Sequence, residues 1–233
     1  MNREPFLRSA KGCCENGRRL LDEAELLEFE KCPATRYYLS MIAQEEAAKA
    51  FVLYLVTVDA LSWTPFLLRA TRDHKCKQLV GIILDYISPD TDEFLRRMDL
   101  WVLEKKQLQL PNSVADAMNL LRHEKIRRWE SGWWVWAEDP EYDKSALDVA
   151  EGKRDRDKQR ALYVELGKNG QIGGTPERLA KNQADDEYER GRRFESCIRS
   201  LLDGGTAWDL ERIEGYFEAL FSNASVFIDS QLT

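Results

Sequence analysis

The sequence predicts an all-α fold. Apolar residues recur at three- and four-residue steps along most of the 233-residue chain, as in helices that bury one face. Prolines and glycines divide this pattern into segments of typical helix length. Residues 161–173 alone alternate as a strand pair does, around an Asn-Gly turn. The prediction is a helical bundle with additional helices and one small β-hairpin near residues 161–173.

The first two helices are expected to form an antiparallel pair. One is predicted over residues 6–29, and Pro33 stands at the start of a second that ends near Asp59. The connection between them is short, which favours antiparallel packing.

The segment after these helices leaves the orientation of His74 open. Pro65 begins a short helix that runs through Arg69, and Asp73 is a candidate N-cap for another helix. A helix continuous from Pro65 would point His74 into solvent. A helix that restarts at Asp73 would let His74 face a neighbouring helix end.

After residue 90, the sequence predicts further helices over residues 91–107 and 111–129. Residues 153–160 alternate in charge sign, which indicates a solvated helix end. Thr175 and Pro176 predict the start of a long helix with a weak apolar stripe, whose first half should be largely exposed. Gly204 and Gly205 end it, and Thr206 resembles the first residue of a capping box for the last helix.

We expect one domain over residues 1–233. Its core would be residues 6–130, with a C-terminal extension over residues 145–233 packed on it, and the weakest seam at residues 136–144.

Composition narrows the class of protein. A net charge of −7 argues against an overall nucleic-acid coat, although a local basic patch fits. Five cysteines without CxxC spacing and two histidines favour reduced thiols and no metal site. The N-terminus lacks an apolar signal core, and no apolar run approaches the roughly 20 residues of a membrane span. We therefore expect a cytoplasmic protein that is not in a membrane and carries no cofactor.

Charged residues interrupt the apolar stripe of the second helix. Glu45 and Lys49 fall on this stripe with Glu46 at its edge, and Glu45 precedes Lys49 by four residues, the favourable order for an ion pair. Desolvating two ions costs several kcal/mol, so such a pair on a buried face needs a reason. Function is one reason. A buried polar network of Glu45, Lys49 and His74 that fixes the register of neighbouring helices is another.

Three separated pieces of the sequence resemble the abortive-infection protein AbiV family, whose domain is grouped with the HEPN helical bundles. The pieces are AKGCCENGRRLLDEAELL from Ala10, AQEEAAKA from Ala43 followed by HKCK from His74, and KQRALYV from Lys158 running to Pro176. Their order and spacing carry the resemblance, which spans roughly residues 10–180.

This resemblance implies a HEPN-like all-α bundle and a role in bacterial defence against phage. Many HEPN proteins are metal-independent endoribonucleases with an R-x4–6-H motif, and Arg69 with His74 is the one match in this chain. A histidine can take or give the proton of a 2′-hydroxyl group. An arginine can hold the scissile phosphate. HEPN domains commonly pair around a shared cleft, so the resemblance also implies a homodimer.

The site residues expected from this resemblance fall into two groups. Arg69, His74, Glu45, Glu46 and Lys49 are expected to be catalytic, with a glutamate orienting the histidine or a lysine. Arg72, Lys75 and Lys77 are expected to contact RNA. The expected partners are RNA or the translation machinery, with a phage protein as trigger.

Two other interpretations remain open. The chain could be a non-catalytic protein that binds a phage or toxin partner through its bundle surface, with the tryptophans of residues 129–136 as an anchor. Those tryptophans could instead stack bases beside basic residues, or simply pack against the bundle. The third interpretation is a helical bundle whose polar stripe is purely structural.

Overall fold

The computed structural model describes residues 2–104, 109–131 and 141–222. Helices account for most of these residues, and a two-stranded hairpin is the one sheet among them, so the predicted fold class is confirmed. The elements are α1 (Glu4–Glu25), α2 (Ala34–Thr57), α3 (Pro65–Arg72), α4 (His74–Ile87), α5 (Thr91–Glu104), α6 (Asn112–Asn119), the π-helix η1 (Leu120–Arg127), α7 (Arg128–Ser131), α8 (Lys144–Ala150), α9 (Lys153–Arg160), β1 (Glu165–Leu166), β2 (Ile172–Gly174), the 3-10 helix η2 (Pro176–Arg178), α10 (Lys181–Leu202) and α11 (Leu210–Ser222).

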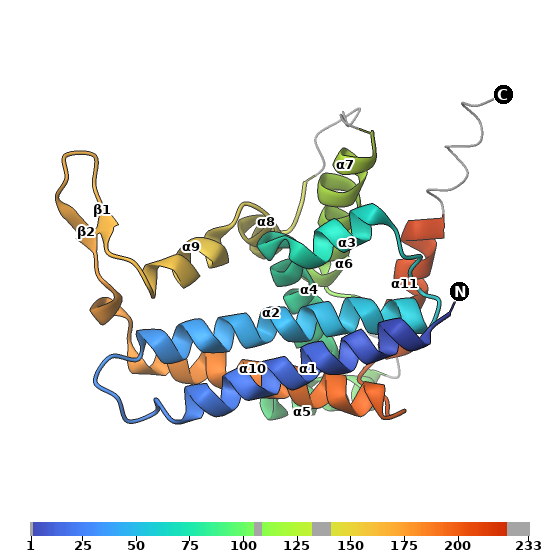
Figure 1. The fold of residues 1–233 in the computed structure, drawn as a ribbon. Helices are drawn as coiled ribbons and strands as arrows, with labels where there is room; N and C mark the ends of the chain where they lie inside the picture. The colour runs from blue at the N-terminus through green and yellow to red at the C-terminus, as the bar shows by residue number, and fades with distance from the viewer. Residues whose placement is uncertain (1, 105–108, 132–140, 223–233) are drawn as a thin grey trace.

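Three long helices form one layer of the molecule. Helices α1, α2 and α10 run side by side, and the shorter helices α3, α6, α8 and α9 lie above these three in the view of Figure 1. Helix α2 is the centre of this arrangement, because it packs against α1, α10 and α4. Its side chains are buried nearly all round, including Phe51 and Leu55, which are 0% exposed. Such a helix is apolar on every side except where it carries buried polar groups.

The hairpin lies at one end of the molecule. Strands β1 and β2 are antiparallel and connected through Gly170, which has φ +78° and so adopts the left-handed conformation that favours glycine. The predicted hairpin near residues 161–173 is therefore confirmed. Figure 1 shows it projecting beyond α9.

Two predicted helix starts are wrong. Thr175 precedes only the short η2, and Leu179 then adopts an extended backbone, so α10 begins at Lys181. The last helix begins at Leu210, which leaves Thr206 outside it. The first half of α10 has exposed residues, as expected, but Ala184 and Tyr188 are buried against the rest of the bundle, so that expectation holds only in part.

The predicted single domain over residues 1–233 stays a prediction. Helix α10, which belongs to its expected extension at residues 145–233, lies along α1 and α2 of its expected core at residues 6–130. No helix among the described residues is long and apolar enough to cross a membrane.

All five cysteines are free. Burial is the main cause that raises the pKa of Cys14 and of Cys197 to about 11. Their thiolate forms are therefore scarce at neutral pH, which makes these thiols packing residues rather than nucleophiles.

Gly191 allows α10 to approach the other two long helices closely. A Cβ atom at this position would lie 2.8 Å from Leu21 Cδ2 in α1 and 3.6 Å from the Ser40 carbonyl oxygen in α2. We expect Gly191→Leu to lower the free energy of unfolding by about 1–3 kcal/mol, because the larger side chain overpacks this contact. Urea denaturation of the full chain measures the change.

Gly12 provides the matched control. It is exposed in α1, and a Cβ atom there would have no neighbour within 4 Å. Gly12→Leu should leave stability unchanged or raise it by up to about 1 kcal/mol, because glycine is a poor helix former. Equal losses in the two variants would contradict the close approach at Gly191.

Candidate active site

The site is built around one buried carboxylate. Glu45 lies in the middle of α2 and is only 3% exposed. Its Oε2 atom lies 2.6 Å from His74 Nδ1 and 2.6 Å from Lys77 Nζ, and its Oε1 atom lies 2.6 Å from Lys158 Nζ. These partners come from α4 and α9, so the carboxylate joins three helices.

The start of α4 brings its first turn to Glu45. The Asp73 backbone is extended and its carboxylate accepts a hydrogen bond from the Cys76 backbone N–H at 3.0 Å, as an N-cap residue does. The helix therefore restarts at His74, which is the alternative that turns this side chain toward a neighbouring helix. Gln78 follows one turn later and donates to Glu45 Oε1 at 3.3 Å.

Helix α9 supplies a residue that the sequence analysis missed. Lys158 belongs to the charge-alternating run interpreted as a solvated helix end, but it is only 4% exposed. That interpretation is wrong for this face of α9. Gly152 begins the helix with φ +88°, and a Cβ atom there would meet Lys75 Cε at 2.7 Å, so the turn into α9 favours glycine.

The charges of the cluster balance. Two carboxylates, Glu45 and Asp155, face the ammonium groups of Lys77 and Lys158, and Lys158 Nζ lies 2.9 Å from Asp155 Oδ1. Burial alone would raise the pKa of Glu45, but the two ammonium groups outweigh it and hold the pKa below its ordinary value. Burial likewise disfavours the charged form of Lys158, but Glu45 and Asp155 outweigh it and raise the pKa of this lysine. Both groups are therefore ionised at neutral pH.

His74 lies at the solvent edge of this cluster. Its side chain is 51% exposed, whereas the Glu45 side chain is 3% exposed. The imidazole Nδ1 atom lies 2.6 Å from Glu45 Oε2 and 3.0 Å from Lys158 Nζ. Because Glu45 is ionised, the shorter contact is an Nδ1–H donated to the carboxylate. The lone pair of the ring is then on Nε2.

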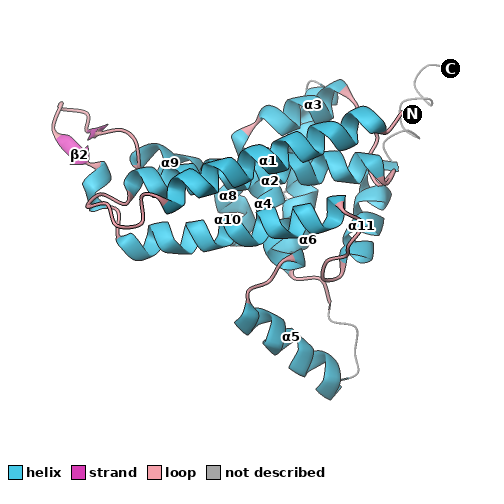
Figure 2. Ribbon diagram, turned by 60° about the horizontal axis from the view of Figure 1, so that its bottom comes forward, coloured by secondary structure: helices cyan, strands magenta, loops and turns pink. Residues whose placement is uncertain are grey.

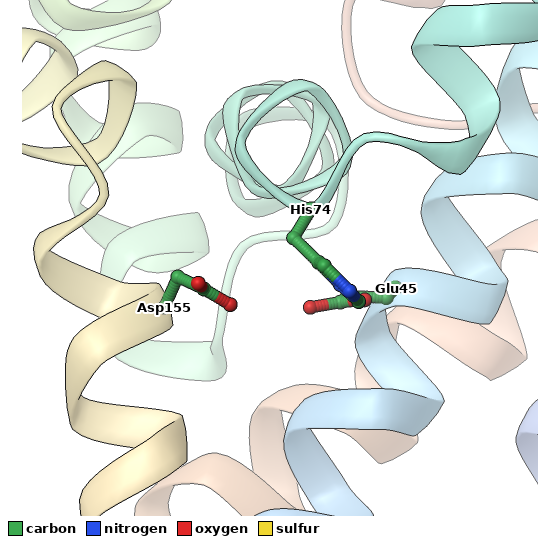
Figure 3. A group of neighbouring side chains, drawn as sticks. All are labelled: Glu45, His74 and Asp155. Atoms are coloured by element: carbon green, nitrogen blue, oxygen red, sulfur yellow. The ribbon is translucent and has the colours of Figure 1, made fainter.

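Three residues of the cluster have the chemistry of a metal site. Figure 3 shows Glu45, His74 and Asp155 pointing toward one another from α2, α4 and α9, and one ligand atom from each lies within 4.8 Å of the others. Carboxylate oxygens and imidazole nitrogens are ligands of Zn²⁺. Lys158 Nζ lies among these groups, at 2.6 Å from Glu45, 2.9 Å from Asp155 and 3.0 Å from His74.

The model of the HEPN_AbiV family, described as AbiV, matches residues 6–194. The chain belongs to the HEPN_AbiV family. No curated protein matches the chain. No solved structure matches it either.

The AbiV match covers every residue of the cluster, including Lys158. The signal for this lysine was present in the sequence, because Lys158 is the first residue of the third piece that carries the family resemblance. Its burial could not be inferred from the alternating charges around it.

The other catalytic residues expected from the AbiV resemblance lie apart from Glu45. The Lys49 ammonium lies 2.5 Å from Glu46, so the expected pair of Glu45 with Lys49 is wrong. The Arg69 guanidinium lies over the Trp129 ring, 4.4 Å from its centroid. Among the described residues, Arg69 and His74 share no hydrogen bond or ion pair. Trp133, Trp134 and Trp136 lie outside the described residues.

The residues expected to contact RNA differ in their exposure. Lys77 is 9% exposed and bonded to Glu45, so it takes the place expected for Lys49 instead of a place on the surface. Lys75 is half-buried and donates to the Glu151 carbonyl oxygen at 3.3 Å. Arg72 is exposed. Arg72 is therefore the one of these three cations that is well placed for a large ligand.

A second polar network holds α9 in place beside the site. Arg154 pairs with Glu187 of α10 at 2.7 Å, and Gln44 of α2 donates to the same carboxylate at 2.8 Å. Arg190 pairs with Asp85 and lies 3.6 Å from Glu187. Burial alone would raise the pKa of Glu187, but Arg154 and Arg190 outweigh it and lower the pKa. Helix α9 is thereby fixed to α2 and α10 one turn before Lys158.

The buried position of Glu45 predicts a large cost for removing its charge. We expect Glu45→Gln to lower the free energy of unfolding at pH 7 by about 3–5 kcal/mol, because Lys77 and Lys158 lose their counterion. Urea denaturation at several pH values measures this.

The pH dependence has a definite sign. A carboxyl with a lowered pKa in the folded state contributes stability above its unfolded value, here 4.5, and loses that contribution as the pH falls through the folded value. The gap in stability between the native protein and Glu45→Gln should therefore narrow below about pH 4.5. A gap that stays constant down to pH 3 would contradict the ionised state of Glu45.

Proposed function

We propose that this protein is an abortive-infection effector of phage defence that cleaves RNA without a metal ion, with His74 as the group that transfers the proton. Membership in the HEPN_AbiV family supports the defence role. The observation that supports catalysis is the position of the His74 imidazole. The ring is half-exposed, yet its Nδ1 atom is held by the buried carboxylate of Glu45.

This pairing suits His74 for base catalysis. A carboxylate on Nδ1 fixes the ring tautomer and leaves the lone pair of Nε2 for substrate. Nε2 takes the proton of a ribose 2′-hydroxyl, the 2′-oxygen attacks phosphorus, and the bond from phosphorus to the 5′-oxygen breaks. The products are a 2′,3′-cyclic phosphate and a 5′-hydroxyl, whose oxygen takes a proton from water.

The proposal also includes contacts between arginine side chains of the protein and the phosphates of the RNA. Arg72 is exposed at the end of α3, two residues before His74. Arg69 lies one turn earlier in the same helix, and its guanidinium is engaged by Trp129. A homodimer would bring a second set of these cations to the cleft. The proposed partners are RNA or the translation machinery, and the proposed trigger is a phage protein.

The test is RNA cleavage by variants of the one proposed base. His74→Ala should reduce cleavage of total RNA by about 10²–10⁴-fold, because the proton acceptor is lost. Denaturing gels with end-group analysis of the fragments measure both the rate and the cyclic phosphate.

His123→Gln is the control, because His123 lies in η1 outside the cluster. It should cleave at the native rate. Equal RNA decay in the native protein, His74→Ala and His123→Gln would eliminate catalysis by His74.

A second candidate function is supported by α5. Figure 2 shows this helix projecting from the bundle, to which its first half is attached by the Arg97 hydrogen bond to the Tyr86 carbonyl oxygen and by Phe94 packing on Trp208. Its exposed apolar side chains include Leu95 at 55%, Trp101 at 56% and Val102 at 59%. An unpartnered apolar helix face is typical of protein-binding surfaces. The alternative is a non-catalytic protein that binds a phage or toxin partner through this face.

Phage protection separates the two candidates. If binding through α5 is the whole function, Leu95→Asp combined with Trp101→Asp should abolish protection in a plaque assay, because charges on the face oppose docking. His74→Ala should then protect as well as the native protein. Loss of protection in His74→Ala, with an intact fold by circular dichroism, would contradict the purely binding role.

A further inference from the structure

Lys158 has a position that the proposed base chemistry does not require. It is a buried cation on α9, 84 residues beyond His74 in the chain, and its Nζ atom contacts all three of Glu45, His74 and Asp155. Lys77 neutralises the same Glu45 carboxylate from α4. One lysine would suffice to balance Glu45, so the second cation has another reason to be buried.

The groups around Lys158 explain its presence. Two carboxylates and an imidazole nitrogen form a ligand set that suits Zn²⁺, and their ligand atoms lie within 4.8 Å of one another. To bind the ion through Nδ1, the neutral His74 ring would take the tautomer with its proton on Nε2. A zinc ion at about 2.0–2.2 Å from each ligand atom would need inward movements of less than about 1 Å from the Nζ-to-ligand distances. The ammonium of Lys158 lies where this ion would be.

Asp155 shows that the Lys158 charge is needed there. Its Oδ1 atom is buried and has no hydrogen bond from the described residues, although it lies 2.9 Å from Lys158 Nζ. The positive charge of the lysine therefore compensates this oxygen by electrostatic attraction. Without that charge, Glu45 would keep Lys77, but Asp155 would lose the ammonium beside it.

We propose that Lys158 is a positioning residue that takes the place of a divalent cation: its ammonium holds the Glu45 and Asp155 carboxylates in register, and Glu45 in turn holds the His74 ring. The catalytic meaning of this role rests on the proposed function. The arrangement of the three side chains does not rest on the proposed function, because it follows from the charges alone. The site is thus a metal-type ligand set closed by a side chain of the same protein.

The proposal predicts that removing Lys158 creates a zinc site. Lys158→Ala shortens the side chain to its Cβ atom and leaves the three ligands with an uncompensated charge. In the full chain, Zn²⁺ should bind Lys158→Ala with a stoichiometry of one and raise its Tm by at least about 4 °C. The native protein should show neither effect. Calorimetric titration and thermal unfolding after treatment with a chelator measure them.

Two variants control for binding elsewhere, including at the five cysteines. Lys77→Ala removes the other ammonium from Glu45 but leaves Lys158 in place, so it should be destabilised without gaining a zinc effect. Lys158→Ala combined with His74→Ala lacks one ligand and should lose the added zinc binding. Mg²⁺ should have little effect on Lys158→Ala, because it prefers six oxygen ligands.

The outcomes separate this inference from the proposed function. Zinc binding by Lys158→Ala that depends on His74 supports the inference, even if no variant cleaves RNA. Zinc binding that persists without His74, or that appears equally in Lys77→Ala, overturns it. If Lys158→Ala does not fold alone, it should refold with Zn²⁺, and failure to refold with the ion also overturns the inference.

Discussion

The desolvation of the Glu45 carboxylate is the constraint on which this structure depends. An ionised carboxylate at 3% exposure is tolerable only if cations reach it within the protein. Helix α2 carries no cation on that face that does so, since Lys49 pairs with Glu46. The cations come instead from the first turn of α4 and from α9. The placement of both elements against α2 is therefore coupled to one charge.

The second network extends this coupling to α10. Arg154 lies one turn before Lys158 on α9, and it bonds to Glu187 of α10 and to Gln44 of α2. Gln44 and Glu45 are neighbours in α2, so adjacent residues anchor the two networks. Two charged residues of α10, Glu187 and Arg190, meet this part of the bundle. Polar contact substitutes here for part of the apolar stripe that α10 lacks.

The sequence predicted the helices and the anomalous Glu45 well, because helical periodicity is a local property of the chain. It could not identify the partners of Glu45. Lys49 is four residues away and offered a local explanation, whereas Lys158 is 113 residues away and belongs to a run that alternates like a solvated surface. The sequence left two directions open for His74, one for a helix continuous from Pro65 and one for a helix that restarts at Asp73, and the Asp73 N-cap of α4 decided between them. Long-range charge pairing depends on tertiary placement, which residue spacing does not encode.

Different residues of the cluster determine the stability of the fold and the proposed chemistry. Glu45, Asp155, Lys77 and Lys158 carry two negative and two positive charges, so these four residues together have no net charge. His74 is the group of this set with substantial exposure, so it lies at the surface edge of the cluster rather than in the core. Loss of the imidazole leaves the buried charges balanced, whereas loss of Glu45 removes the carboxylate that pairs with Lys77 and leaves Lys158 with Asp155. A functional defect in a Glu45 variant therefore mixes folding with chemistry. A defect in a His74 variant reports on the chemistry, because the balance of charge that holds α2, α4 and α9 together survives without the ring.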